Sequence, residues 1–140
     1  MPVRAIHHVD FAVHDVERSL EFYLALLGPL GVTEVERFPT YRGTEEVACV
    51  RVGRQYLDFR PADGGEHHYY HVGIEHIAFT VDSRQEVEEA HARCVELGAR
   101  VQYPPEEDND IPGYWAMFVF DPDGIRVEIL HWPDAEGDAT

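Results

Sequence analysis

Two histidines and two carboxylates occupy matching positions of a repeated pattern in this chain. His8 and His76 are offset by 68 positions, and Asp58 and Glu128 are offset by 70. Each lies in a segment of alternating apolar and polar residues, on the side away from the apolar ones. If a twofold axis relates the two copies and their sheets form one cavity, the four side chains converge. Such a set suits a divalent Ni, Co, Zn, Mn or Fe(II) ion with positions open for substrate or water.

The carboxylate at position 58 is one methylene shorter than a glutamate. Asp58 therefore reaches the ion directly, only through water, or not at all. Without it, His8, His76 and Glu128 remain as a set of two histidines and one carboxylate, which favours iron.

Three further residues are candidates for contact with a substrate. Arg60 and Arg126 lie two positions from Asp58 and Glu128, on the same side of each strand pattern. Each arginine either binds a substrate anion or neutralises the neighbouring carboxylate. Trp115 begins an apolar run through Phe120, which we expect to be buried on both faces with some members lining the cavity.

The elements that position these residues also occur twice. Alternation predicts strands over Ile6–Val13 and Ile74–Val81. A helix follows each strand, the first opened by Asp15 and the second by a capping box of Ser83 and Glu86. Both helical patterns end in Leu-Gly, and Gly28 and Gly98 are expected as left-handed stops.

Later segments predict two hairpins and one irregular stretch. Residues 47–52 and 55–60 flank Gly53, while residues 115–120 and 125–131 flank the turn sequence Asp121-Pro-Asp-Gly124. The acidic, proline-containing segment Tyr103–Gly113 is expected to be a surface loop or lid.

Each half of the chain is too small to form a stable core comfortably alone, so the halves are expected to pair. We therefore predict one domain over residues 1–140. Its first module spans about 4–61, a linker spans 62–73, and the second module spans about 74–132.

Composition narrows the range of partners. The 140 residues carry 27 acidic and 11 basic side chains, a net charge of −16, which disfavours nucleic acid and anionic membranes. All basic residues are Arg, and the absence of Lys excludes Schiff-base chemistry. The spacing of Cys49 and Cys94 predicts two free thiols. The chain contains neither a bilayer-spanning stretch nor a signal-peptide pattern, so the expected location is the cytoplasm.

Three motifs resemble the vicinal oxygen chelate superfamily, which includes glyoxalase I, extradiol dioxygenases, fosfomycin resistance enzymes and bleomycin resistance proteins. They are His8-Val-Asp-Phe-Ala-Val with the following helix to Leu27-Gly28, Glu75-His-Ile-Ala-Phe-Thr-Val-Asp, and Phe120-Asp-Pro-Asp-Gly-Ile-Arg-Val-Glu-Ile. The resemblance implies an α+β fold in which two tandem βαβββ modules pair into a cupped, mostly antiparallel sheet, often in a homodimer. It implies metal ligands at the same four positions, His8, Asp58, His76 and Glu128.

Positions at which this sequence differs from individual members of the superfamily restrict the function that we expect. Ala12 and Ala62 stand where glyoxalase I members typically carry an Arg and an Asn that contact glutathione. We therefore expect a glyoxalase-like lyase or isomerase acting on a small oxygenated substrate that is not linked to glutathione. Glu128 is the expected general base, and Asp58 is expected to return the proton. The alternatives are an Fe(II) ring-cleaving dioxygenase and a non-catalytic protein that sequesters a drug or metabolite.

Overall fold

A computed structural model of the chain describes residues 2–39 and 46–133. Its contacts divide the chain into two compact units with a boundary between Gly65 and Glu66. That boundary falls inside the segment 62–73 for which the sequence predicts a linker. The joining of the two units into one domain stays a prediction.

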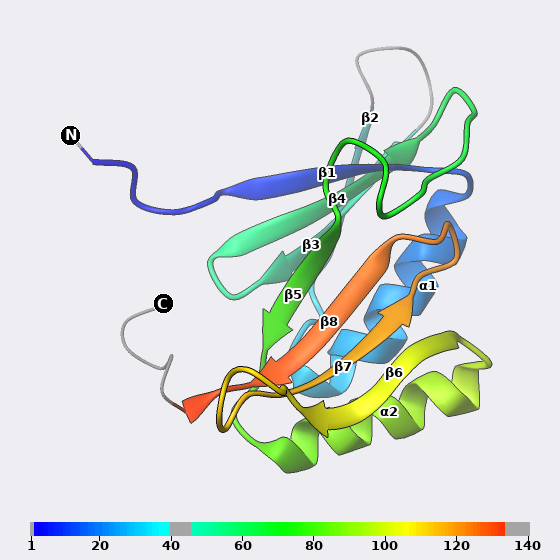
Figure 1. Ribbon diagram of the computed structural model, residues 1–140. Coiled ribbons are helices and arrows are strands. Elements are labelled where there is room, and N and C mark those ends of the chain that lie inside the picture. Colours follow the sequence, from blue (N-terminus) through cyan, green and yellow to red (C-terminus); the bar gives the residue numbers. More distant parts are fainter. Residues whose placement is uncertain (1, 40–45, 134–140) are drawn as a thin grey trace. The chain divides into compact units, whose positions relative to one another are not determined.

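Both units repeat the order strand, helix and three strands (Figure 1). The first contains β1 (His8–Val13), α1 (Val16–Leu27), the 3-10 turn Gly28–Leu30, β2 (Val35–Pro39), β3 (Glu46–Val52) and β4 (Gln55–Pro61). The second contains β5 (His76–Thr80), α2 (Arg84–Leu97), β6 (Arg100–Glu107), β7 (Trp115–Phe120) and β8 (Arg126–His131). The predicted βαβββ modules and α+β class are confirmed.

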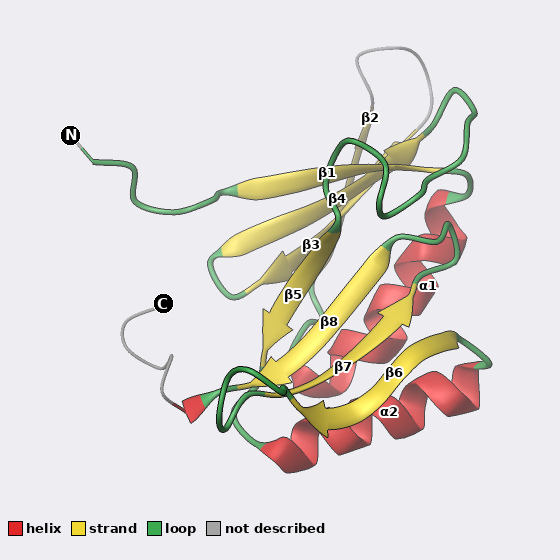
Figure 2. Cartoon of the chain, in the orientation of Figure 1, coloured by secondary structure: helices red, strands yellow, loops and turns green. Residues whose placement is uncertain are grey.

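The two sheets have the same topology, which Figure 2 shows in yellow. Their strand orders are β1-β4-β3-β2 and β5-β8-β7-β6. In each sheet the first strand of the unit runs parallel to the last, and the other pairings are antiparallel. The helix of each unit packs on its own sheet. Since residues alternate across a strand, the helix covers one face, and the other face carries the polar residues of interest.

Aromatic packing forms the core between α1 and its sheet. Tyr23 of α1 is fully buried and stacks on Phe59 of β4, with ring centroids 4.9 Å apart. Phe11 of β1 lies 5.7 Å from Phe59. In the second unit, α2 buries Val87, Ala90 and Cys94. The apolar positions therefore face the helices, as the alternation predicts.

The helix starts follow the sequence prediction, but one helix end does not. Asp15 caps α1 by accepting from the Arg18 N–H at 3.1 Å, and Ser83 accepts from the Glu86 N–H at 3.2 Å. Gly98 is left-handed with φ 71°, as predicted. The prediction for Gly28 is wrong, because this residue is right-handed with φ −55°. The chain continues into a 3-10 turn through Pro29, and the left-handed residue is Gly31, with φ 99°.

The predicted loop Tyr103–Gly113 is wrong over its first part, since β6 extends through Glu107. Among the described strands, β6 pairs with β7 alone, and this pairing contains register shifts. An edge strand with bulges tolerates proline, because an N–H facing away from the neighbour is not needed for pairing. Pro104 and Pro105 therefore do not end the strand. The edge strand β2 is also unpredicted, and its exposed residues show no apolar face.

Both cysteines are free and buried, as predicted. None of the described helices is long and apolar enough to cross a membrane.

Candidate metal-binding site

In the first unit, three potential metal ligands lie together on the face away from α1. The parallel register of β1 and β4 places Asp10 opposite Asp58, and His8 lies two residues before Asp10. One ligand atom from each of His8, Asp10 and Asp58 lies within 4.8 Å of the other two. The structure thus brings together the two predicted residues of this unit, His8 and Asp58, and adds Asp10.

Asp58 is the buried member of this group. It is 8% exposed, and its Oδ1 accepts no hydrogen bond from the described residues. A buried carboxylate oxygen without a partner is costly, because it has lost its water without gaining a donor. A cation would supply the missing partner.

The environment of Asp10 is shaped by opposing charges. Burial raises the pKa of Asp10, and the neighbouring Asp58 carboxyl raises it further. Arg60 lowers it in part, since its Nη2 lies 2.7 Å from Asp10 Oδ2. Arg60 therefore pairs with Asp10 rather than with Asp58. Its Nε is buried and donates no hydrogen bond to a described residue.

Cys49 lies opposite Asp58 in the pairing of β3 with β4. Burial raises the pKa of its thiol to about 12, and a hydrogen bond with Asp58 adds to the rise. The thiol therefore stays protonated at neutral pH and is a hydrogen-bond neighbour of the carboxylate rather than a thiolate ligand.

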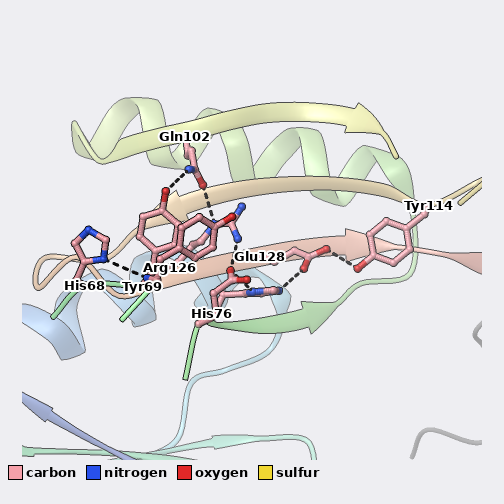
Figure 3. Close-up of polar contacts among 9 residues, drawn as sticks. His68, Tyr69, His76, Gln102, Tyr114, Arg126 and Glu128 are labelled. Carbon is pink, nitrogen blue, oxygen red and sulfur yellow. Dashed lines mark hydrogen bonds and ion pairs between the residues drawn. The ribbon is translucent and has the colours of Figure 1, made fainter. Parts of the chain in front are cut away.

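In the second unit, His76 lies between two carboxylates (Figure 3). Its Nδ1 is 2.8 Å from Glu75 Oε1, and its Nε2 is 3.0 Å from Glu128 Oε1. A carboxylate on one imidazole nitrogen fixes the orientation of the ring, and histidines that bind metal ions commonly have such a partner. The predicted pair His76 and Glu128 therefore meets, on one face of β5 and β8.

Glu75 is itself held by Arg126, which is 8% exposed. Arg126 also donates from Nε to Gln102 Oε1 at 2.7 Å, and Gln102 donates to the Tyr69 hydroxyl at 3.2 Å. Partial burial acts to raise the pKa of Glu75, but the hydrogen bonds from His76 and Arg126 outweigh it and lower the pKa. Arg126 thus pairs with Glu75 and not with Glu128, and neutralising Glu128 was one of the two roles that the sequence left open for it.

Tyr114 completes the environment of Glu128. Its hydroxyl donates to Glu128 Oε2 at 2.5 Å, as Figure 3 shows. Burial raises the pKa of Tyr114, and the bond to Glu128 adds to the rise, so the phenol remains a donor.

Trp115, predicted to contact substrate, packs against α2. Its indole N–H donates to Glu88 at 3.2 Å, and the Arg84 guanidinium lies 4.6 Å from the ring centroid. Phe118, not Trp115, shares a face with Glu128, because the two residues are opposite each other in β7 and β8. Trp115 therefore lies on the α2 side of β7, on the face opposite to that of Glu128.

The donor sets fit a divalent cation in both units. One unit offers an imidazole and two carboxylates with an orphaned buried oxygen, and the other offers a carboxylate-oriented imidazole beside a buried glutamate. These are nitrogen and oxygen ligands of the kind that Zn, Ni, Co, Mn and Fe(II) accept. The meeting of both pairs at one ion stays a prediction.

Sequence reasoning missed Asp10, Glu75 and Tyr114. Asp10 could have been found from the sequence, because it follows His8 by two positions and lies on the same face of the strand. Glu75 precedes its strand, where alternation carries no information. Tyr114 lies in a loop, and its contact with Glu128 depends on loop geometry that no periodicity encodes.

Comparison with known proteins gives consistent matches over most of the chain. A family model described as the Glyoxalase/Bleomycin resistance protein/Dioxygenase superfamily matches residues 5–129. The uncharacterized protein YqjT of Bacillus subtilis (strain 168) is 28% identical over 132 residues, which cover 89% of this chain and 97% of YqjT.

Solved structures agree with this match. A glyoxalase candidate from Bacillus halodurans has a TM-score of 0.73 and 29% identity, covering 90% of this chain and 94% of its own. A glyoxylase/bleomycin resistance protein/dioxygenase domain from Frankia sp. EAN1pec has a TM-score of 0.76 and 24% identity, covering 98% and 96%. The second likeness concerns the fold alone.

Proposed function

The chain belongs to the glyoxalase/bleomycin resistance protein/dioxygenase superfamily, and on this premise we propose that it is a metal-dependent, glyoxalase-like lyase or isomerase. Its substrate is a small molecule with adjacent oxygens that chelate the metal ion. The proposed ligands are His8, Asp58, His76 and Glu128, and Asp10 is an additional oxygen donor beside Asp58. The two units contribute the two pairs, within one chain or across a homodimer.

The observation that carries this proposal is the unpartnered Oδ1 of buried Asp58. It belongs to a carboxylate that faces a second carboxylate, Asp10, and an imidazole, His8. Two close carboxylates repel each other and resist burial unless a proton or a cation lies between them. A divalent ion satisfies both at once.

When bound, the ion supplies Lewis-acid stabilisation of the negative charge that develops on a substrate oxygen, worth several kcal/mol of barrier. Glu128 acts as the general base, taking a proton from the carbon next to a carbonyl. Asp58 returns a proton to the substrate, and exchange with water transfers to Asp58 the proton that Glu128 has taken, so that the pair is restored. Glu75 and Arg126 orient His76, because each is already engaged in the hydrogen bonds described above.

The two arginines take different roles in this proposal. Arg126 donates hydrogen bonds to Glu75 and Gln102 and is a positioning residue. Arg60 retains a buried Nε without a partner among the described residues, so it is the arginine that binds an anionic group of the substrate. Ala12, opposite Arg60 in the sheet, leaves no cation at the position where glutathione-linked relatives carry one, which argues for another substrate.

We place the enzyme in the cytoplasm as a homodimer. Its free, buried Cys49 and Cys94 fit a reducing compartment.

The direct experiment begins with elemental analysis of the protein as purified. Thermal shifts with Ni, Co, Mn, Zn and Fe(II) are then measured on metal-free protein, and hydroxy- and oxo-acids are screened on the metal-loaded form. A ligand that binds the folded state raises the midpoint of unfolding. We expect a bound divalent ion and a further rise with substrates that carry adjacent oxygens.

Two outcomes would contradict the proposal. Turnover that requires dioxygen and stops under anaerobic conditions would indicate ring cleavage by Fe(II) rather than proton transfer. No stabilisation by any of the five ions, together with tight binding of an apolar drug or metabolite, would indicate a sequestering protein.

A further inference from the structure

Glu128 is almost completely enclosed, with 3% of its surface exposed. Its neighbours across the sheet are Ala78 in β5 and Phe118 in β7, and neither side chain has a hydrogen-bond donor. Within the described residues, the two carboxylate oxygens have separate partners. Oε1 lies 3.0 Å from His76 Nε2, and Oε2 accepts from the Tyr114 hydroxyl at 2.5 Å.

Tyr114 is fixed by the loop that precedes β7. Its N–H donates to the Ile111 carbonyl at 3.1 Å, and its carbonyl accepts from the Asp108 N–H at 2.8 Å. Asp108 Oδ1 accepts from the N–H groups of Asp110 and Ile111, which closes an Asx turn. The phenol ring lies 5.6 Å from that of Trp132. The hydroxyl is therefore held in place before any ligand binds.

We propose that Tyr114 is a positioning residue for Glu128: its hydroxyl occupies Oε2, so that Oε1, on the His76 side, is the oxygen that would face the metal ion and, once released from it, take the substrate proton. This inference rests on the proposed function and deepens it. In the proton-transfer step, the C–H bond of the substrate breaks, an O–H bond forms on Oε1, and the electron pair moves to the substrate carbonyl oxygen. Without the Tyr114 hydroxyl, either oxygen of Glu128 could face the metal ion or take the substrate proton.

The test compares Tyr114→Phe with Tyr103→Phe, which removes a hydroxyl from an exposed tyrosine of β6. Co²⁺ is titrated into metal-free protein, and Kd and the visible absorption of the bound ion are measured. Loss of a group that hydrogen-bonds to a metal ligand typically weakens metal binding about 10-fold or more. We expect this loss in Y114F, with a changed Co²⁺ absorption spectrum because Oε2 is free to bind, and wild-type values in Y103F.

A metal-free measurement accompanies the titration. Removing the hydroxyl leaves a buried carboxylate oxygen without a donor, so the unfolding midpoint of Y114F should fall by about 4 °C or more. If Y114F fails to fold, Asp108→Ala replaces it, since this variant keeps the hydroxyl but releases the turn. Its Co²⁺ binding should weaken in the same direction, and Asp110→Ala should leave it unchanged.

The outcomes separate this inference from the proposed function. Wild-type Co²⁺ affinity and spectrum in a folded Y114F would overturn the positioning role, even if the midpoint falls, and would leave the proposed function standing. An absence of Co²⁺ binding by the wild-type protein would overturn the proposed function, and the inference with it.

Discussion

Asp58 is in a position that is electrostatically unfavourable without a cation. It is buried opposite Asp10, its Oδ1 has no partner among the described residues, and the nearby Arg60 is paired with Asp10. Structures keep such features at sites where a ligand compensates for them. The group His8, Asp10 and Asp58 therefore has the donor atoms of a cation site, as the proposed function requires.

Replacing Asp58 with Asn should stabilise the metal-free protein but reduce the stability that the protein gains from a bound metal ion. In metal-free protein, Asp58→Asn removes a buried like charge beside Asp10 and should raise the unfolding midpoint. With excess Co²⁺, the wild-type protein should gain more stability than the variant, because a ligand has been lost.

The measurement is a pair of thermal melts for each variant, with Asp110→Asn as the control at an exposed loop position. A metal-free D58N that is less stable than the wild type would indicate that the carboxylate is already satisfied and would contradict this account.

At the scale of single residues, sequence patterns identified the face of each predicted ligand but not its partners. Alternation placed His8 and Asp58 on one face of their strands and His76 and Glu128 on one face of theirs. It could not reveal that Arg60 pairs with Asp10 or that Arg126 pairs with Glu75, because such choices depend on side-chain rotamers and on neighbouring strands.

Among the elements, α2 shows how local signals position a functional strand. The Ser83 hydroxyl accepts from the Glu86 N–H, and Glu86 in turn accepts from the Asp82 N–H at 3.1 Å. This capping box starts the helix directly after β5, the strand that carries His76.

Ser83→Ala should lower the free energy of unfolding by about 1 kcal/mol, because one N–H at the helix start loses its acceptor. Ser83→Asn should retain most of the stability, since Asn caps about as well as Ser. Urea denaturation measures both variants. Equal losses in the two would indicate that the serine contributes through packing rather than capping.

The burial of Cys94 on α2 predicts that its thiol reacts slowly in the folded protein. Burial raises the pKa of the Cys94 thiol to about 11. An unfolded cysteine has a pKa of about 8.5 and is mostly thiolate at pH 9, whereas folded Cys94 should stay protonated and enclosed.

Iodoacetamide at pH 9 should therefore leave Cys94 unmodified in native protein and modify it in denaturant, as measured by peptide mass spectrometry. Rapid native modification would show that α2 opens readily from its sheet.

Edge elements were the least predictable. Strands β2 and β6 each pair with one neighbour and bury little, so they lack the apolar alternation that identified β1, β5 and the hairpin strands. The prolines of β6 favoured a loop, and only the pairing with β7 shows otherwise. Central strands and helices could be predicted because their apolar pattern reflects burial. Edge strands could not, because they bury too few residues to produce such a pattern.

For the whole molecule, the informative feature is duplication. Each unit has a helix on one face of a four-stranded sheet and two or more metal-ligand types on the other. Because the repeat keeps the same chemistry at matching positions, we propose that both units bind one ion. The strongly acidic chain, with a net charge of −16, also attracts cations generally.

The proposed homodimer is tested by sedimentation at moderate salt. The chain mass is 16.0 kDa, and we expect a species of twice that mass whether or not metal is bound. A monomer that nevertheless binds metal stoichiometrically would place the complete site within one chain.

The most direct test of the central claim is Co²⁺ titration of His8→Ala and His76→Ala, with His91→Ala on α2 as the matched control. If both units supply ligands to one ion, the wild type and the control bind one ion per chain, and each of the two ligand variants loses that binding. Stoichiometric binding retained by either ligand variant would contradict the claim that the two halves share a metal site.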